Sequence, residues 1–311
     1  MTGKYALVFP GQGAQKVGMG RELFEAFDAS RATFSEADDA LGESLSRLIF
    51  EGPPEALTLT ANTQPAIVTV SIAALRALAT EVALAPAFVA GHSLGEYSAL
   101  VSSRAISFAD AVRTTRARGT YMQEAVPPEV GAMAAIMKSD EAAVRKACEE
   151  AAQGEVVSPA NFNSPDQIVI SGHAGAVERA SAILKNGGAR SIPLKVSAPF
   201  HCALMRPAAE ALGSFLGGVR FQPPAVPVVT NVEASPNVDA SRIADLLVAQ
   251  VTSSVRWTDS VRHMISCGVS TFIELGPGNV LAGLIGKIDR NTKVISVGDP
   301  SGVAAAVKEL A

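Results

Sequence analysis

Short apolar segments bounded by glycine or proline alternate along this chain with longer segments whose apolar residues recur at helical spacing. The short segments predict buried strands at 5–9, 85–90, 227–231, 271–275 and 293–297. The longer segments predict helices from residue 21 onward and at 66–80, 94–101, 108–125, 242–250, 257–266 and 280–288. Strands that alternate with helices indicate an α/β fold with a mainly parallel sheet covered by helices.

The middle of the chain follows a different order of elements. Helical segments at 140–152 and 174–185 alternate with strand-like segments at 132–137, 155–158, 167–171 and 191–196. The resulting order, βαββαβ over about 70 residues, is typical of a ferredoxin-like module. We therefore predict a large domain made of residues 1–126 and 199–311, with a ferredoxin-like small domain, residues 127–198, inserted into it.

One turn carries the clearest chemical signal. Gly91-His92-Ser93-Leu94-Gly95 joins a predicted strand to a predicted helix, and G-x-S-x-G in that context is the nucleophile elbow of α/β-hydrolase-like folds. Glycine on both sides of the serine removes Cβ atoms that would clash in so sharp a turn. The pattern predicts a large α/β-hydrolase-like domain with the Ser93 hydroxyl at the apex. The Leu94 N–H then begins the helix and faces a developing oxyanion.

A serine nucleophile needs a positioned base, usually histidine, and the chain has 4 histidines. His92 lies in the elbow, where its side chain is expected to point to the other side. His173 is expected at the surface of the small domain, and His263 on the surface of a helix or packed against it. His201 follows a strand at its exit into a loop, which is typical of catalytic residues, and it is the predicted base. The residue that orients the His201 ring stays open, because no acid stands out at a strand end between the serine and this histidine.

Residues 10–15 form a glycine-rich loop after the first predicted strand. No Lys-Ser/Thr follows, as a phosphate-binding P-loop requires. The loop is either a tight turn or a segment whose backbone N–H near Gln12 faces Ser93 as a second oxyanion donor.

Two predicted helices carry polar residues whose roles the spacing does not decide. Thr63 is predicted to cap the helix at 66–80 with Pro65 in its first turn, which makes Gln64 a solvated residue rather than a ligand contact. The helix at 108–125 begins with a capping box at Ser107. It carries three arginines, and the spacing selects none of Arg113, Arg116 and Arg118.

Composition excludes several classes of function. The 311-residue chain has a net charge of −4 and no basic run, so we expect no nucleic-acid partner. No apolar run approaches the roughly 18–20 residues that span a membrane, and the N-terminus has no signal-peptide pattern. The 3 cysteines lie far apart without C-x-x-C, which argues against a disulfide framework or a zinc site and fits a reducing cytoplasm. We expect a cytoplasmic protein with no metal and no cofactor.

The chain resembles the malonyl-CoA:acyl carrier protein transacylase family. The resemblance runs through FPGQG at 9–13 and GHSLGEYSAL at 91–100, and it continues in one order over nearly the whole chain. The other matching segments are 62–66, 118–119, 122–123, 131–136, 161–165, 201–205 and 274–278.

This resemblance implies a set of catalytic roles. Ser93 is the nucleophile and His201 the base. Gln250 holds the His201 ring through a carbonyl oxygen, and Gln12 and Leu94 supply oxyanion N–H groups.

The resemblance also implies how the acyl group is recognised. Arg118 pairs with the free carboxylate of a malonyl group, while Gln64 and Asn161 line the pocket. Phe200 stands where many bacterial members have serine. A large ring there disfavours an α-branched acyl group, so malonyl is favoured over methylmalonyl.

The implied reaction is ping-pong acyl transfer from malonyl-CoA to the phosphopantetheine thiol of a holo acyl carrier protein, through a malonyl-serine intermediate. We expect a monomer. Lys185, Arg190 and Lys195 are candidates for a basic patch that binds an acidic carrier. Two alternatives stay open: a serine esterase or thioesterase on the same elbow, and a non-catalytic module that binds the carrier.

Overall fold

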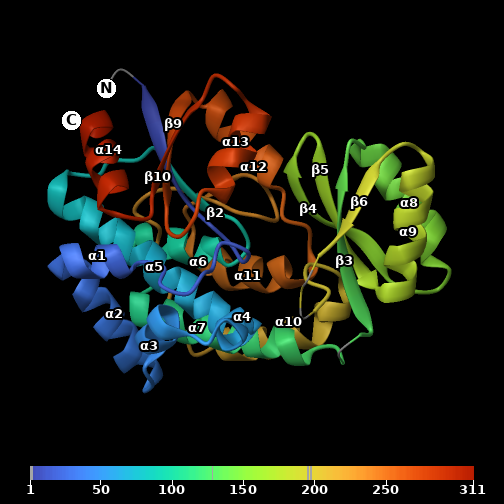
Figure 1. The fold of residues 1–311 in the computed structure, drawn as a ribbon, viewed down its shortest axis with the longest axis horizontal. Coiled ribbons are helices and arrows are strands. Elements are labelled where there is room, and N and C mark those ends of the chain that lie inside the picture. The colour runs from blue at the N-terminus through green and yellow to red at the C-terminus, as the bar shows by residue number, and fades with distance from the viewer. Residues whose placement is uncertain (1–2, 128, 195, 197) are drawn as a thin grey trace.

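β1 (Lys4–Phe9) lies inside a six-stranded sheet that runs in the order β10-β9-β1-β2-β7-β8. The computed structural model describes residues 3–127, 129–194, 196 and 198–311, and Figure 1 shows this sheet to the left of a smaller one. Neighbouring strands are parallel except for the last pair, β7 with β8. β1 pairs directly with β2 and β9. The other strands of the sheet are β2 (Phe88–Gly91), β7 (Val228–Val229), β8 (Pro236–Asn237), β9 (Val269–Leu275) and β10 (Lys293–Val297).

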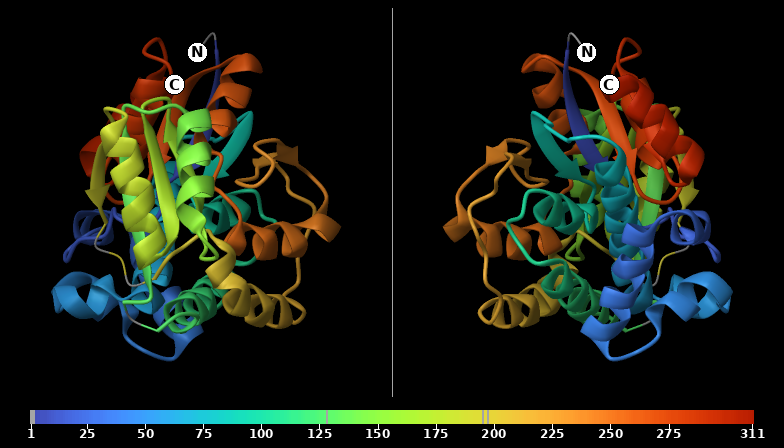
Figure 2. Two further views of the ribbon diagram at one scale, coloured as in Figure 1. Left: turned by 90° about the vertical axis from the view of Figure 1, so that its right-hand side faces the viewer. Right: turned by 90° about the vertical axis from the view of Figure 1, so that its left-hand side faces the viewer.

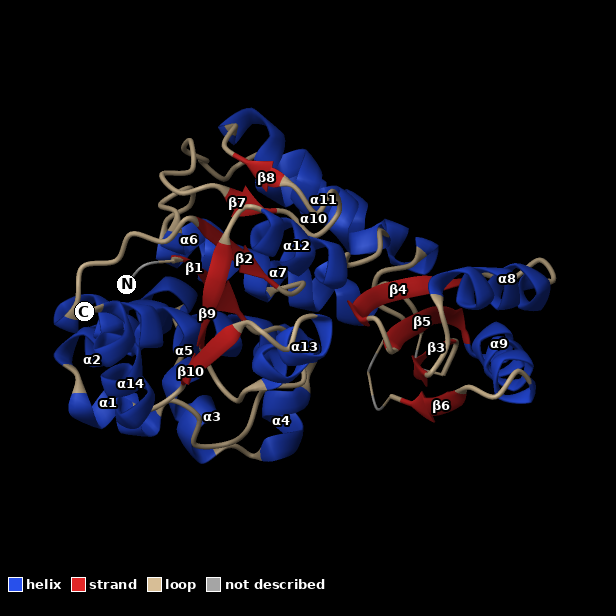
Figure 3. Cartoon of the chain, turned by 90° about the horizontal axis from the view of Figure 1, so that it is seen from above, coloured by secondary structure: helices blue, strands red, loops and turns tan. Residues whose placement is uncertain are grey.

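Helices cover both faces of this sheet, because successive side chains of a strand point to opposite sides. Leu7 and Phe9 are buried in the larger core. Ala6 and Val8 are buried in a second core with α12 (Trp257–Ser266) and α13 (Val280–Ile288). Figure 3 shows the layers from above. The larger core is built with α1 (Arg21–Ala26), α2 (Asp28–Leu41), α3 (Leu45–Glu51), α4 (Pro54–Thr58), α5 (Thr60–Glu81), α6 (Gly95–Ser102), α7 (Phe108–Glu124), α10 (Arg206–Leu216), α11 (Ile243–Thr252) and α14 (Pro300–Leu310).

The start of α5 differs from the sequence prediction. The helix begins at Thr60, so Pro65 lies inside it and Thr63 is no cap; the Thr63 hydroxyl donates to the Leu57 carbonyl. Proline has no N–H for the carbonyl four residues earlier. That carbonyl, on Ala61, accepts a hydrogen bond from Arg116 Nη1 at 2.9 Å instead. This tertiary contact lets the helix continue past the proline. The other predicted cap is confirmed, because the Ser107 side chain accepts from the Asp110 N–H at the start of α7.

The smaller sheet has the order β4-β5-β3-β6 and is antiparallel throughout. Its two helices pack side by side on one face, as the left view of Figure 2 shows. This is the predicted ferredoxin-like arrangement, inserted into an α/β-hydrolase-like domain. Its elements are β3 (Gly131–Met137), α8 (Glu141–Ala152), β4 (Val157–Ser164), β5 (Gln167–His173), α9 (Ala174–Asn186) and β6 (Arg190–Pro193).

We propose that the division of the chain into 1–126 with 199–311 and 127–198 follows these two sheets. Lys185 and Arg190 are exposed at the end of α9 and the start of β6. Lys195 lies outside the described residues. No helix of the described ranges is both long and apolar enough to cross a bilayer.

Candidate active site

The elbow lies where β2 ends and α6 begins, at the carboxyl edge of the large sheet. Ser93 has a φ of 52°, in the left-handed region. A Cβ on Gly91 would lie 2.0 Å from the Gly95 carbonyl carbon, and one on Gly95 would lie 2.2 Å from the Phe9 carbonyl oxygen. Both glycines are therefore required by close backbone approach, which places the serine at the apex of the turn.

The structure brings Ser93 and His201 together across 108 residues, with Oγ 2.8 Å from Nε2. His201 follows β6 on the return to the large domain, also has a positive φ (59°), and is 4% exposed. Two residues held in strained backbone conformations thus meet at one hydrogen bond, and strain of this kind clusters at functional sites.

A main-chain carbonyl orients the His201 ring. Nδ1–H donates to the carbonyl oxygen of Gln250 at 2.9 Å, so Nε2 carries the free lone pair that accepts from Ser93. Burial, with the charge of Arg118 as a second cause, lowers the pKa of His201 from 6.5 to about 3. The ring is therefore a neutral base at physiological pH.

Arg118, on α7, is buried (1% exposed) and points at the Ser93 hydroxyl. Its Nη2 donates to Ser93 Oγ at 3.2 Å and to Gln250 Oε1 at 2.9 Å, and its Nη1 donates to Gln64 Oε1 at 2.6 Å. Its Nε has no partner among the described residues, and none of their carboxylates forms an ion pair with it. A buried cation held only by neutral groups is suited to a negatively charged ligand.

The other two arginines of α7 have different partners. Arg113 pairs with Asp110, and Arg116 pairs with Glu43 and holds the start of α5. The tertiary structure therefore singles out one arginine where the spacing did not.

The side chain of Gln250 connects Arg118 to a buried acid. Its Nε2 donates to Glu96 Oε2 at 2.8 Å and to the Ser93 carbonyl at 3.2 Å, while its Oε1 faces Arg118. Burial raises the pKa of Glu96 to about 7. Sequence reasoning missed Glu96 as a site residue, although its place inside the elbow motif was a usable signal.

The oxyanion donors assigned by resemblance lie beside the serine. Leu94 and Gln12 both line the cavity in front of Ser93. Among the described residues, no group accepts a hydrogen bond from either backbone N–H, and the side chain of Gln12 is turned to Thr60. The two N–H groups are thus free to face a substrate oxygen.

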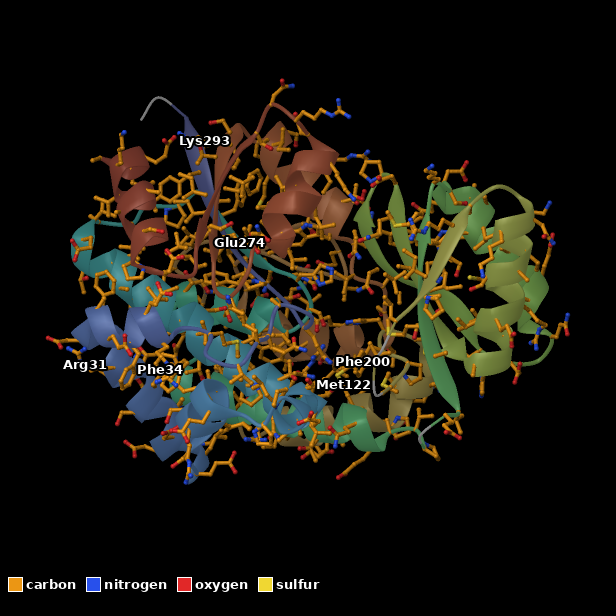
Figure 4. All side chains as sticks on the ribbon, in the orientation of Figure 1. Arg31, Phe34, Met122, Phe200, Glu274 and Lys293 are labelled. Carbon is orange, nitrogen blue, oxygen red and sulfur yellow. The ribbon has the colours of Figure 1, made fainter. Side chains whose placement is uncertain are left out.

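A cavity of about 570 Å³ opens over these groups between the two domains. Gln64, Asn161 and Phe200 line it as the resemblance implied. Gln64 is buried inside α5 (1% exposed), which corrects its prediction as a solvated residue. Met122 and Phe200, both labelled in Figure 4, line the cavity and give it an apolar wall.

The remaining histidines have other partners. His92 also lines the cavity, but its Nε2–H donates to Asn163 Oδ1 at 2.8 Å. His173 Nδ1 accepts from the Val156 N–H inside the small domain. His263 lies on α12 next to Cys267. Within the described ranges, no cluster of three or more His, Cys, Asp or Glu residues is arranged to hold a metal.

Comparisons with known proteins identify the family of the chain. Residues 6–296 match the model of the acyl transferase domain family. The malonyl CoA-acyl carrier protein transacylase of Escherichia coli strain K12 is 50% identical over 306 residues, which is 98% of this chain and 99% of that protein. An acyl carrier protein S-malonyltransferase from Vibrio cholerae superposes with a TM-score of 0.96 at 47% identity, covering 97% of this chain and 99% of the other. A malonyl-transacylase solved in complex with a type II PKS acyl-carrier protein gives a TM-score of 0.96 at 45% identity, covering 98% and 99%.

Proposed function

Since the chain belongs to the acyl transferase domain family, as its motifs indicated, we propose that it transfers a malonyl group from malonyl-CoA to the phosphopantetheine thiol of a holo acyl carrier protein. The observation that carries the proposal is Arg118, a buried guanidinium without a carboxylate partner, 3.2 Å from the Ser93 hydroxyl. Malonyl differs from acetyl by one carboxylate, and a guanidinium binds a carboxylate through two parallel hydrogen bonds. The relatives whose names include malonyl support the same acyl group.

In the first half-reaction, Ser93 Oγ attacks the thioester carbonyl while its proton passes to His201 Nε2, 2.8 Å away. The negative charge that develops on the carbonyl oxygen is stabilised by the N–H groups of Leu94 and Gln12. The C–S bond then breaks, coenzyme A leaves as a thiol with the proton from His201, and a malonyl-serine ester remains.

In the second half-reaction, the carrier thiol gives its proton to His201 and its sulfur attacks the ester carbonyl. The C–O bond to Ser93 breaks, and Oγ takes the proton back from Nε2. Because coenzyme A leaves before the carrier thiol reacts with the malonyl-serine ester, the mechanism is ping-pong. The main-chain carbonyl that orients His201 stabilises an imidazolium less than a carboxylate would. This suits an exchange between a thioester and an ester of similar energy.

A serine thioesterase on the same elbow is the alternative. Such enzymes commonly orient the histidine with an acid, whereas His201 is held by a carbonyl oxygen. We further propose that the chain acts as a cytoplasmic monomer without a cofactor, with malonyl-CoA and the carrier protein as its partners and no nucleic acid.

Intact mass after brief incubation with malonyl-CoA tests the proposal. We expect one malonyl adduct on the wild type, no adduct on Ser93→Ala, and transfer of the group to holo carrier protein with little loss to water. An adduct on Ser93→Ala at wild-type yield would exclude the serine intermediate. An adduct that hydrolyses faster than it is transferred would favour the thioesterase.

A further inference from the structure

Both backbone polar groups of Ser93 are held by side-chain amides from distant parts of the chain. The Ser93 N–H donates to Oδ1 of Asn231, 138 residues away, at 2.6 Å. The Ser93 carbonyl accepts from Nε2 of Gln250, 157 residues away, at 3.2 Å. Asn231 also donates from Nδ2 to the Gly91 carbonyl at 2.6 Å. Its amide therefore spans the elbow from the last residue of β2 to the nucleophile.

Asn231 is itself firmly held. It is 1% exposed, and its own N–H donates to Glu96 Oε2 at 3.0 Å. The same Glu96 oxygen accepts from Gln250 Nε2, so the two amides that hold Ser93 share one anchor. The Asn231 carbonyl accepts from the Arg256 N–H at 3.0 Å. All of these contacts lie at the edge where the parallel strands β2 and β7 both end.

The elbow needs such support because of its backbone. A serine with a φ of 52° lies in a backbone region that residues other than glycine rarely adopt. Such a conformation persists only where the surrounding structure over-determines it. If the turn relaxed, Ser93 Oγ would leave its 2.8 Å contact with His201 Nε2. We propose that Asn231 is the positioning residue that holds the nucleophile elbow in this conformation. The inference rests on the proposed function in one respect, the role of Ser93 as nucleophile.

The chemistry of an amide explains why asparagine suits this place. The elbow presents an N–H and a carbonyl to the same side chain, so that side chain must accept with one atom and donate with the other. An ionised carboxylate only accepts, and it would set an oxygen against the Gly91 carbonyl. A protonated carboxyl accepts and donates, as the amide does.

This difference provides the experiment. Asn231→Ala and Asn231→Asp are compared with the wild type by the rate at which a serine-directed fluorophosphonate labels Ser93 between pH 5 and pH 8. The charged and titratable groups around Asn231 and the serine include Glu96 on α6, Arg118 on α7, His92 in the elbow, His201, and Arg256 before α12. Because Glu96 titrates within this range, each variant is expressed as a ratio to the wild type at the same pH.

We expect Asn231→Ala to label roughly 10-fold to 100-fold more slowly at every pH, the scale on which a misplaced reacting group loses rate. Asn231→Asp should be equally slow at pH 8 and recover toward the wild-type rate as the pH falls. Burial beside Glu96 raises the pKa of the introduced carboxyl, and its protonated form donates to the Gly91 carbonyl again. Recovery within one sample also shows that the variant is folded. With malonyl-CoA, kcat should fall while KM stays near the wild-type value.

Asn237→Asp is the matched control. Asn237 is a buried asparagine (3% exposed) whose side chain, among the described residues, bonds only to the backbone of Asp239. Its variant should therefore label at the wild-type rate throughout. Wild-type rates for both Asn231 variants, or an Asn231→Asp ratio that does not change with pH, would overturn the inference. A wild type that the fluorophosphonate labels but malonyl-CoA does not acylate would instead overturn the proposed function.

Discussion

His201 Nδ1 donates to the main-chain carbonyl of Gln250 at 2.9 Å, while the amide of that glutamine is turned toward Arg118 and Glu96. One residue therefore serves the two halves of the site by different means. Its backbone orients the His201 ring, and its side chain contacts the Arg118 guanidinium that donates to Ser93.

Because the backbone and the side chain of Gln250 contact different groups, two substitutions of this residue should affect activity in different ways. Gln250→Ala keeps the carbonyl that His201 needs, so we expect turnover to fall only about 10-fold, far less than loss of the base costs. Gln250→Glu sets a carboxylate against Arg118 and should compete with malonyl, so malonyl transfer should fall more than acetyl transfer. Steady-state rates with both acyl-CoA substrates check this. A loss for Gln250→Ala as large as that for His201→Ala would mean that the amide itself orients the ring.

Arg118→Ala should lose malonyl transfer by roughly 30-fold to 5000-fold, the equivalent of removing one member of a buried charged pair. Acetyl transfer should fall little or rise, because acetyl has no carboxylate to pair. Arg118→Lys keeps the positive charge and should recover part of the malonyl rate. The recovery should be incomplete, because an ammonium cannot reproduce the bidentate geometry. The measurement is the malonyl-to-acetyl ratio of kcat/KM.

Arg113→Ala is the matched control on the same helix, because Arg113 pairs with Asp110 at the surface. Its ratio should equal that of the wild type. If Arg118→Ala lowered transfer of both acyl groups equally, the residue would be structural and the malonyl assignment would lose its main support.

His201→Ala should nearly abolish acyl-enzyme formation, by on the order of 10⁴-fold or more, because no other described histidine contacts Ser93 Oγ. His263→Ala should keep most of the activity, since that ring lies on α12 beside Cys267. Single-turnover acylation by malonyl-CoA gives both values. The reverse order of effects would show that the wrong histidine had been assigned.

Two buried groups should change stability with pH in opposite directions. The unfolded chain binds a proton at His201 below pH 6.5, but the folded chain does so only near pH 3. The unfolded state therefore binds more protons in this window, and the free energy of unfolding falls as the pH falls. Glu96 has a folded pKa of about 7 against 4.5 unfolded. Here the folded state binds more protons, so stability falls as the pH rises through this window.

Urea unfolding of His201→Asn and Glu96→Gln against the wild type measures these contributions separately. As the pH falls from 7 to 5, the free energy of unfolding of His201→Asn should rise by about 2 kcal/mol relative to that of the wild type. As the pH rises over the same range, the free energy of unfolding of Glu96→Gln should rise by a similar amount, about 2 kcal/mol, relative to that of the wild type. Differences that stay constant with pH would contradict the buried titrations.

Lys185→Glu and Arg190→Glu test the proposed docking of an acidic carrier, since both side chains are exposed at one end of the small domain. We expect a higher apparent KM for the carrier protein and an unchanged KM for malonyl-CoA. Lys146→Glu, an exposed change on α8 of the same domain, is the control. An equal effect on both substrates would count against docking at this end.

The sequence by itself determined the elements whose physics is local. A strand, a G-x-S-x-G turn and a helix follow from residues in direct succession. The cap at Ser107 forms because its acceptor and the Asp110 N–H are three residues apart. The alternation of strands and helices likewise indicated the fold class, and ordered motifs indicated the family.

The tertiary structure decided what depends on contacts between distant residues. It chose Arg118 among three arginines, because only that guanidinium reaches Ser93 and Gln250. It allowed α5 to continue past Pro65, because Arg116 donates a hydrogen bond to the carbonyl that the proline leaves without a helical partner. Spacing along the chain indicates which side chains share a face of one helix or strand. It does not indicate which backbone groups of another element contact that face. For that reason the spacing did not show the carbonyl of Gln250 behind His201, which only the resemblance implied. The amide of Asn231 across the elbow became visible only in the folded chain.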